Sequence, residues 1–238
     1  MRYGVTFPTE LARSGEVSYA GKALYLIALT VQPRSIAEVA RAAGMDRAQA
    51  SRLCSELVRA GWMRMVANGG KRVPVPVVPD DLQKQCVQRL TKMLAMAPQK
   101  GEFLMKRWLD LLVASDDLIE NARPGLLTNP LTGEPLEFDR YYLEGVAFEF
   151  NGRQHYGPTA AYTKEEAFKD QRARDLLKKG LSQEMGIVLV EVTSEDLSLE
   201  NMEKKIPTVL QRNMVDREGL YLKALARACQ DYHAKAVR

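Results

Sequence analysis

Carboxylate and amide side chains gather between residues 136 and 156, in the segment LEFDRYYLEGVAFEFNGRQHY. Asp139 closes one expected strand, and Glu149 and Asn151 take alternate positions on the next strand. Because residues i and i+2 of a strand lie on the same face, Glu149 and Asn151 should project together, beside Asp139 if the strands form a hairpin. An oxygen-rich cluster of this kind suits Mg²⁺. The plainer alternative is a half-exposed hairpin whose acidic residues face solvent.

A glycine turn after this strand is followed by Gln154 and His155. An imidazole, whose pKa lies near neutrality, would then sit beside the carboxylates as a proton carrier. Asn151 can bind a metal or a water through its carbonyl oxygen, but it cannot act as a base or carry positive charge. Phosphodiester hydrolysis needs hard oxygen ligands for a divalent ion, and the segment offers them.

The surrounding segments should position this hairpin. We expect a helix over 101–113 with Glu102 near its start, followed by a stretch rich in turn residues over 115–136. A capping box then opens a long helix over 163–184 that carries Asp175 and Lys178, and an apolar strand of the buried type follows over 187–192. Two packing helices complete the chain, over about 199–213 and 217–236. A strand pair, a crossover helix and a buried strand predict a mixed α/β sheet with covered faces.

In this order the segments resemble the PD-(D/E)xK nuclease superfamily, in particular the branch of the very short patch repair endonucleases and related homing endonucleases. The resemblance covers about residues 100–195 and implies a restriction-endonuclease-like fold and a metal-dependent endonuclease. It implies that Asp139 and Glu149 bind Mg²⁺, or Mn²⁺ in its place, and that Glu102 binds through water. Asn151 departs from the pattern, because a lysine or acidic residue is usual at that position.

The resemblance also implies roles for the remaining polar residues. His155 would move protons, Gln154 and Asn151 would position the water or the phosphate, and Lys178 would offset developing charge. For Lys178 the alternative is an ordinary surface pair with Asp175, three residues earlier on the same helix.

The N-terminal third predicts a winged helix. An apolar helix over 19–31 is followed by a capping box at Ser35 and by a helix capped by Asp46. Asn68-Gly69-Gly70 then separates two β-type runs, which is a strong hairpin signal. On the third helix the apolar residues expected to face inward are Ala50, Leu53, Cys54, Leu57 and Val58.

This layout resembles the winged-helix domains of MarR-like transcription regulators over roughly residues 18–80. The resemblance implies DNA contacts from the outward side of the third helix and from the wing; the candidate residues are Arg47, Gln49, Ser51, Arg52, Lys71 and Arg72. The alternative is a solvated helix face on a module for protein interaction or dimerisation.

The charge distribution favours a nucleic-acid partner for the N-terminal part. Residues 1–80 carry 11 Lys and Arg against 6 Asp and Glu, whereas residues 81–238 carry 23 against 24. A local basic field attracts polyanions. We therefore expect double-stranded DNA as the partner, with RNA as a weaker alternative.

The composition indicates a globular chain of 238 residues with 46% hydrophobic and 27% charged residues. Its apolar runs are too short to span a bilayer, no signal peptide is evident, and three dispersed cysteines predict neither a disulfide framework nor a zinc site. These features lead us to expect a cytoplasmic protein without a membrane partner. The oligomeric state stays open, with a homodimer as one arrangement, since winged helices with long flanking helices often pair.

Three segments follow from these patterns: a winged-helix domain over 1–80, a connecting helix over 81–99 and a nuclease-like domain over 100–238. The fold class is α/β, or α+β overall. The function expected from the sequence is a metal-dependent DNA endonuclease targeted by a winged helix. The alternative is a non-catalytic DNA-binding transcriptional regulator with a degenerate nuclease-like domain, which Asn151 favours.

Overall fold

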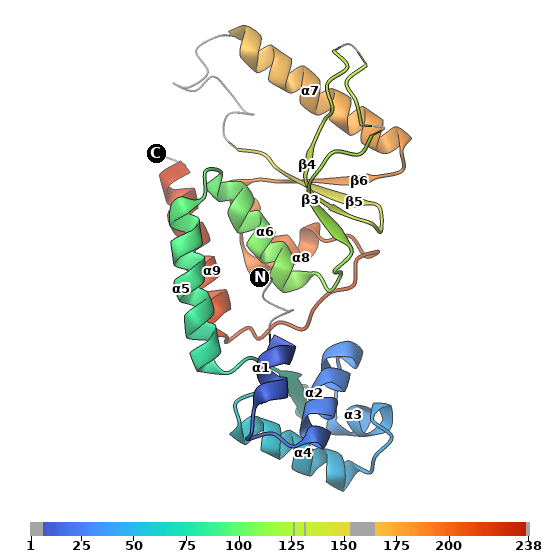
Figure 1. The fold of residues 1–238 in the computed structure, drawn as a ribbon, viewed down its shortest axis with the longest axis vertical. Coiled ribbons are helices and arrows are strands. Elements are labelled where there is room, and N and C mark those ends of the chain that lie inside the picture. Colours follow the sequence, from blue (N-terminus) through green and yellow to red (C-terminus); the bar gives the residue numbers. More distant parts are fainter. Residues whose placement is uncertain (1–6, 126, 131, 153–164, 237–238) are drawn as a thin grey trace. The chain divides into compact units, whose positions relative to one another are not determined.

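The computed structural model describes residues 7–125, 127–130, 132–152 and 165–236 (Figure 1). By its internal contacts the chain divides into two compact units. The N-terminal unit comprises Met1–Met93, Asp110–Leu112 and Asn213–Leu225, and the sheet unit comprises Leu94–Leu109, Val113–Arg212 and Ala226–Arg238. The proposed limits at residues 80 and 100 stay predictions, and the division places residues 81–93 with the N-terminal unit.

The N-terminal unit contains a helix-turn-helix followed by a β-hairpin. Its elements are α1 (Phe7–Arg13), α2 (Tyr19–Val31), α3 (Ile36–Ala42), α4 (Arg47–Arg59), β1 (Met63–Asn68), β2 (Lys71–Pro76) and the first part of α5 (Asp80–Met96). Ser35 and Asp46 cap α3 and α4, since their side chains accept the N–H groups of Glu38 and Gln49. Helix α1 was not expected from the sequence.

The wing hairpin turns through Gly69 and Gly70. Asn68 pairs with Lys71, which leaves the two glycines as a two-residue loop. Both have positive φ, 55° and 76°, as a type I′ turn requires. The hairpin predicted from these glycines is therefore present.

The core of this unit follows the predicted helical periodicity with one correction. Tyr25 packs edge-on against Trp62 with ring centroids 5.6 Å apart, and its hydroxyl donates to the carbonyl of Val77. Four of the five residues expected to face inward from α4 are buried, but Val58 is 39% exposed. Val58 lies at the border of the apolar stripe, where helical spacing alone does not decide burial.

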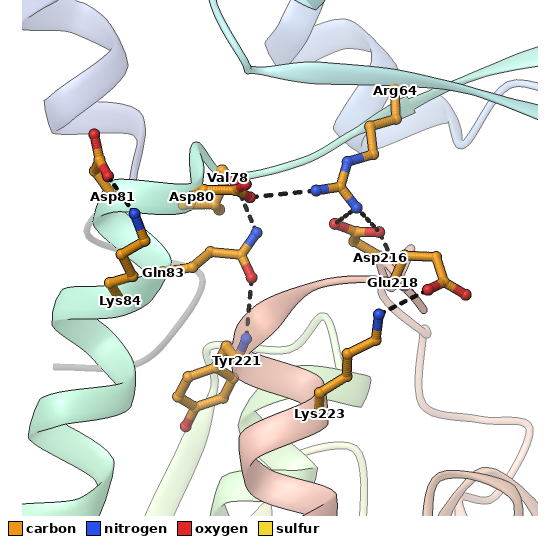
Figure 2. A network of polar contacts seen from close by, with 10 residues as sticks. All are labelled: Arg64, Val78, Asp80, Asp81, Gln83, Lys84, Asp216, Glu218, Tyr221 and Lys223. Atoms are coloured by element: carbon orange, nitrogen blue, oxygen red, sulfur yellow. Dashed lines mark hydrogen bonds and ion pairs between the residues drawn. The ribbon is translucent and has the colours of Figure 1, made fainter.

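A late segment of the chain completes the N-terminal unit (Figure 2). Gln83 is fully buried, donates to the carbonyl of Val78 at 2.8 Å and accepts the N–H of Tyr221 at 3.0 Å. Arg64 on the wing lies between Asp80 and Asp216, at 3.3 and 3.1 Å. Met214, which belongs to the segment Asn213–Leu225, packs against the apolar face of the wing. On that face it contacts the buried cluster of Val73, Val75 and Val77.

The sheet unit contains a mixed four-stranded sheet, which confirms the predicted fold class. Its strands are β3 (Leu118–Ala122), β4 (Phe138–Tyr142), β5 (Val146–Phe150) and β6 (Val188–Val192), in the order β3-β4-β5-β6. The first two pairings are antiparallel, and β5 pairs with β6 in parallel. The unit also contains α6 (Lys100–Leu112) up to Leu109, α7 (Glu165–Glu184), a 3₁₀ turn (Ser194–Asp196), α8 (Leu199–Lys205) and most of α9 (Leu220–Ala236).

Three expectations for this unit were wrong. The turn-rich stretch contains strand β3, whose sequence LIENA carries two polar residues. Strand β6 is an edge strand of the described sheet, so Val188 is 48% exposed and the strand is not of the buried type. Helix α8 ends at Lys205, because Ile206 precedes a proline and such residues disfavour the helical region.

Helices cover both sides of the sheet. Figure 1 shows α7 on one side and α6 and α8 on the other. Leu177 and Leu181 of α7 pack against a buried cluster that includes Phe138 and Ala147. Phe150 at the end of β5 contacts Tyr232 of α9 edge-on, with ring centroids 6.2 Å apart.

Gly101 is required where α6 passes this aromatic pair. A Cβ atom there would overlap the ring of Phe150 and lie 2.6 Å from the hydroxyl of Tyr232. We expect Gly101→Ala to lower the free energy of unfolding by about 2 kcal/mol through overpacking. Gly180→Ala is the matched control: a methyl group added to this glycine of α7 would have nothing within 4 Å, so alanine should stabilise the helix by about 0.5–1 kcal/mol. Urea unfolding measures both changes, and a Gly101→Ala chain at least as stable as the wild type would contradict the close packing at Gly101.

Candidate functional site

The β4–β5 hairpin brings Asp139 and Glu149 together. Arg140 pairs with Phe148 across the two strands, so the same register places Asp139 opposite Glu149. Asp139 Oδ2 accepts the backbone N–H of Phe150 at 2.7 Å. The sequence prediction that these two carboxylates lie side by side agrees with this geometry. The prediction that Asp139 closes a strand was wrong, because Asp139 is the second residue of β4.

Burial and repulsion raise the pKa of Asp139 to about 7. Loss of solvation is the larger cause, and the charge of Glu149 is the next. The hydrogen bond from Phe150 acts in the opposite direction, Glu102 adds further repulsion, and Lys106 partly offsets it. Two neighbouring carboxylates thus act on the pKa of Asp139, and perturbed pKa values of this kind are common at functional sites.

Lys178 reaches this pair from helix α7. Its Nζ donates to Glu149 Oε1 at 2.6 Å, and the two side chains are only 11% and 18% exposed. The contact joins the crossover helix to the middle of the sheet, which a surface pair with Asp175 would not do. The amino group thus lies beside the carboxylate pair, and its role in offsetting charge stays a prediction.

Glu102 is held by a second lysine, on its own helix. Lys106 Nζ lies 2.5 Å from Glu102 Oε1 and 3.0 Å from Glu120 Oε2 on strand β3. It also donates to Asn121 Oδ1 at 2.7 Å. Glu102 thus lies near Asp139, but its carboxylate is engaged by Lys106.

The other predicted catalytic residues are placed only in part. Asn151 is half-buried, and its backbone N–H donates to the carbonyl of Val192 at 2.8 Å, which continues the β5–β6 pairing. Gln154 and His155 lie outside the described residues. The roles of all three stay predictions.

Two carboxylates fit one hard divalent ion. Among the described residues no three His, Cys, Asp or Glu side chains form a ready-made metal cluster. Mg²⁺, however, is usually bound by one or two carboxylates, with waters and substrate phosphates as its other ligands. Asp139 and Glu149 provide this donor set.

Sequence reasoning missed a group of buried charges behind the pair. Arg140 is fully buried on β4, forms an ion pair with Glu120 and donates to the carbonyl of Lys106. Lys106 lies four residues after Glu102, a spacing that favours an ion pair on a helix. That spacing, and an arginine within the strand FDRYY, were the available signals. Nothing in the sequence singled out Asn121.

The predicted DNA-contacting residues lie on one helix and on the wing. On α4, Arg47, Gln49 and Arg52 are exposed and Ser51 is half-exposed. Lys71 and Arg72 are exposed at the wing. The surface that the resemblance requires is therefore accessible within the N-terminal unit, and contact with DNA stays a prediction for each residue.

Comparison with known proteins supports this N-terminal assignment. Residues 21–66 match the IclR helix-turn-helix domain. The match covers α2, α3, α4 and the start of β1, and it supports DNA binding by a winged helix-turn-helix. It names the IclR type in place of the MarR-like class.

Two viral proteins are similar to part of the chain. Uncharacterized protein 033L of Invertebrate iridescent virus 3 is 37% identical over 95 residues, which are 39% of this chain and 48% of the viral protein. Uncharacterized protein 094L of Frog virus 3 (isolate Goorha) is 33% identical over 90 residues, 37% and 58% of the two chains. The chain spans about half the length of the curated relatives it matches. No solved structure matches it.

Among the described helices, none is both long enough and apolar enough to cross a membrane. All three cysteines are free: Cys54 and Cys229 are buried and Cys86 is partly exposed.

Proposed function

We propose that this chain is a metal-dependent DNA endonuclease that hydrolyses phosphodiester bonds and is targeted by its winged helix. The observation that supports it most is the convergence of Asp139, Glu149 and Lys178 from β4, β5 and α7. Two acidic groups near the ends of two central strands, with an amino group beside them, are the residue types that the chemistry needs.

The proposed reaction adds water across a phosphodiester. A new bond forms between the water oxygen and phosphorus, and the bond from phosphorus to one sugar oxygen breaks. One proton of the water passes to the leaving oxygen, which gives a phosphate monoester and a hydroxyl. A bound Mg²⁺ would polarise the phosphate and lower the pKa of the attacking water.

The residues of the chain would then hold the metal ion and neutralise the charge on the phosphate. Asp139 and Glu149 would hold the ion, and their partial burial would keep bulk water away. Lys178 is already within hydrogen-bond distance of Glu149 and would offset charge on the phosphate oxygens. Asn151, Gln154 and His155 keep their predicted roles in positioning and proton transfer.

The winged helix would bind the DNA substrate and bring it to such a site. A shallow hydrolytic site gains affinity and selectivity when a second contact is tethered to it. The exposed residues Arg47 and Arg52 of α4, with the wing residues Lys71 and Arg72, suit the major groove and the backbone of double-stranded DNA.

A second function is a DNA-binding transcriptional regulator without catalytic activity. Asn151 favours it, because this residue cannot supply the charge of a lysine. The IclR-type match agrees equally well with it. In this case the Asp139–Glu149 hairpin would serve a structural or binding role.

Plasmid cleavage distinguishes the two functions. Purified chain with supercoiled plasmid and Mg²⁺ or Mn²⁺ should give nicked or linear product, whereas Glu149→Gln should lose at least about 10²-fold in rate. Glu144→Gln is the matched control, because Glu144 is an exposed carboxylate in the turn of the same hairpin. If neither the wild type nor Glu149→Gln cleaves duplex DNA, single-stranded DNA or RNA with either metal, the result would favour the regulator.

A further inference from the structure

Lys106 is a buried cation whose ammonium group is bonded to three oxygen acceptors among the described residues. Its side chain is 11% exposed, and Nζ lies 2.5 Å from Glu102 Oε1, 2.7 Å from Asn121 Oδ1 and 3.0 Å from Glu120 Oε2. An ammonium group has three N–H donors, so these three oxygens use all of them. This is the arrangement that a bound metal ion would show with oxygen ligands.

The backbone of Asn121, which supplies one of the three oxygens, has an unusual conformation. Asn121 has φ of +51°, a left-handed conformation that is uncommon for residues other than glycine and that asparagine tolerates best. In the β3–β4 register Asn121 falls between Glu120, which pairs with Arg140, and Ala122, which pairs with Phe138. Because lysine can only donate, the contact fixes the oxygen of the Asn121 amide toward Lys106. Strand β3 thus departs from regular geometry where it brings an acceptor to this ammonium group.

The charges of the described residues around Asp139 leave one negative charge when all are ionised. The carboxylates are Glu102, Glu120, Asp139 and Glu149, and the cations are Lys106, Arg140 and Lys178. Nearby Glu191, the β6 partner of Glu149, is offset by Lys179 at 3.6 Å. One divalent ion would change the balance to plus one, and a phosphodiester would return it to zero. A second divalent ion would leave an uncompensated charge of plus two in a partly buried site, which is costly.

We propose that Lys106 takes the place of a second divalent cation, so that the Asp139–Glu149 site binds one Mg²⁺ or Mn²⁺ per chain. The inference rests on the proposed nuclease function and makes it more specific. Glu102 is the third carboxylate that a second ion would use, and Lys106 occupies it. Lys106 is thus a positioning residue that sets the metal stoichiometry of the site.

Direct Mn²⁺ binding to the full chain tests the stoichiometry without any nuclease assay. Isothermal titration calorimetry and the electron paramagnetic resonance signal of free Mn²⁺ should give one ion per wild-type chain, and none with Asp139→Asn. Two ions per wild-type chain would overturn the inference, and this result needs no variant. Absence of Mn²⁺ binding at millimolar concentration would instead overturn the proposed function.

The sign of the change in Lys106→Gln separates charge replacement from a scaffold role. Removing the cation should tighten Mn²⁺ binding by about tenfold, or admit a second ion, because it leaves an extra negative charge near the site. Lys106→Arg keeps the charge and should bind one ion with an affinity close to that of the wild type. Thermal unfolding would verify that each variant is folded. A folded Lys106→Gln chain that binds one ion with unchanged or weaker affinity would overturn the inference.

Discussion

Asp139→Asn is expected to remove plasmid cleavage and, above neutral pH, to stabilise the fold. For cleavage, the substitution replaces a carboxylate ligand by a neutral amide, so the rate should fall by at least about 10³-fold, corresponding to several kcal/mol of lost transition-state stabilisation. The side chain keeps its size, and its oxygen can still accept the N–H of Phe150. The loss should therefore come without misfolding.

The stability effect depends on pH because Asp139 holds its proton more tightly when folded. Its pKa is raised to about 7, mainly by burial and by the charge of Glu149. Between about pH 4 and pH 7 the folded chain keeps a proton that the unfolded chain has released. The contribution of this group to the free energy of unfolding is therefore largest below about pH 4. It decreases as the pH rises and is lost once the pH has passed about 7.

Asparagine carries no charge and escapes this loss. We expect the free energy of unfolding of Asp139→Asn, taken relative to the wild type, to rise by about 2 kcal/mol between pH 5 and pH 8. Urea unfolding without divalent ions measures the difference, with Glu144→Gln as a control that should show no such pH dependence. A stability difference between the variant and the wild type that is the same at pH 5 and at pH 8 would show that the Asp139 charge is not strained.

Local signals explain the parts of the fold that the sequence could predict. The starts of α3 and α4 follow from Ser35 and Asp46, whose side chains cap the helices within three residues. The wing follows from two adjacent glycines. The approach of Asp139 to Glu149 follows from the two-residue period of strands and a short hairpin. Each of these depends on neighbours in the chain.

The parts that were missed depend on contacts between distant residues. Met214 covers the valines of the wing although it lies about 140 positions later in the chain. The residues around Met214 give no indication of this contact. Strand β3 forms because Leu118 to Ala122 can pair with β4, although its polar residues argue against a strand. The engagement of Glu102 by Lys106 could be read from helical spacing, but the added contacts with Glu120 and Asn121 required the sheet.

The second large effect is expected in the winged helix. The double substitution Arg47→Ala and Arg52→Ala should weaken binding to duplex DNA by about 10- to 100-fold at roughly 0.1 M salt, because both residues are exposed on α4 and each phosphate contact releases counterions. For the same reason the slope of log K against log salt should become flatter by up to about 2. Fluorescence anisotropy with a labelled duplex across a salt series measures both quantities.

Removing two positive charges elsewhere in the N-terminal unit tests whether the loss of DNA affinity is specific to α4. Lys84→Ala with Arg89→Ala removes two positive charges from α5, where both residues are exposed. If α4 enters the groove, this control should change affinity by less than about threefold, since neither residue lies on α4 or on the wing and salt weakens the interaction of exposed charges with phosphates they do not contact. Equal losses in both double variants would mean that net charge alone attracts DNA, and an unchanged affinity after loss of Arg47 and Arg52 would mean that α4 contacts another partner.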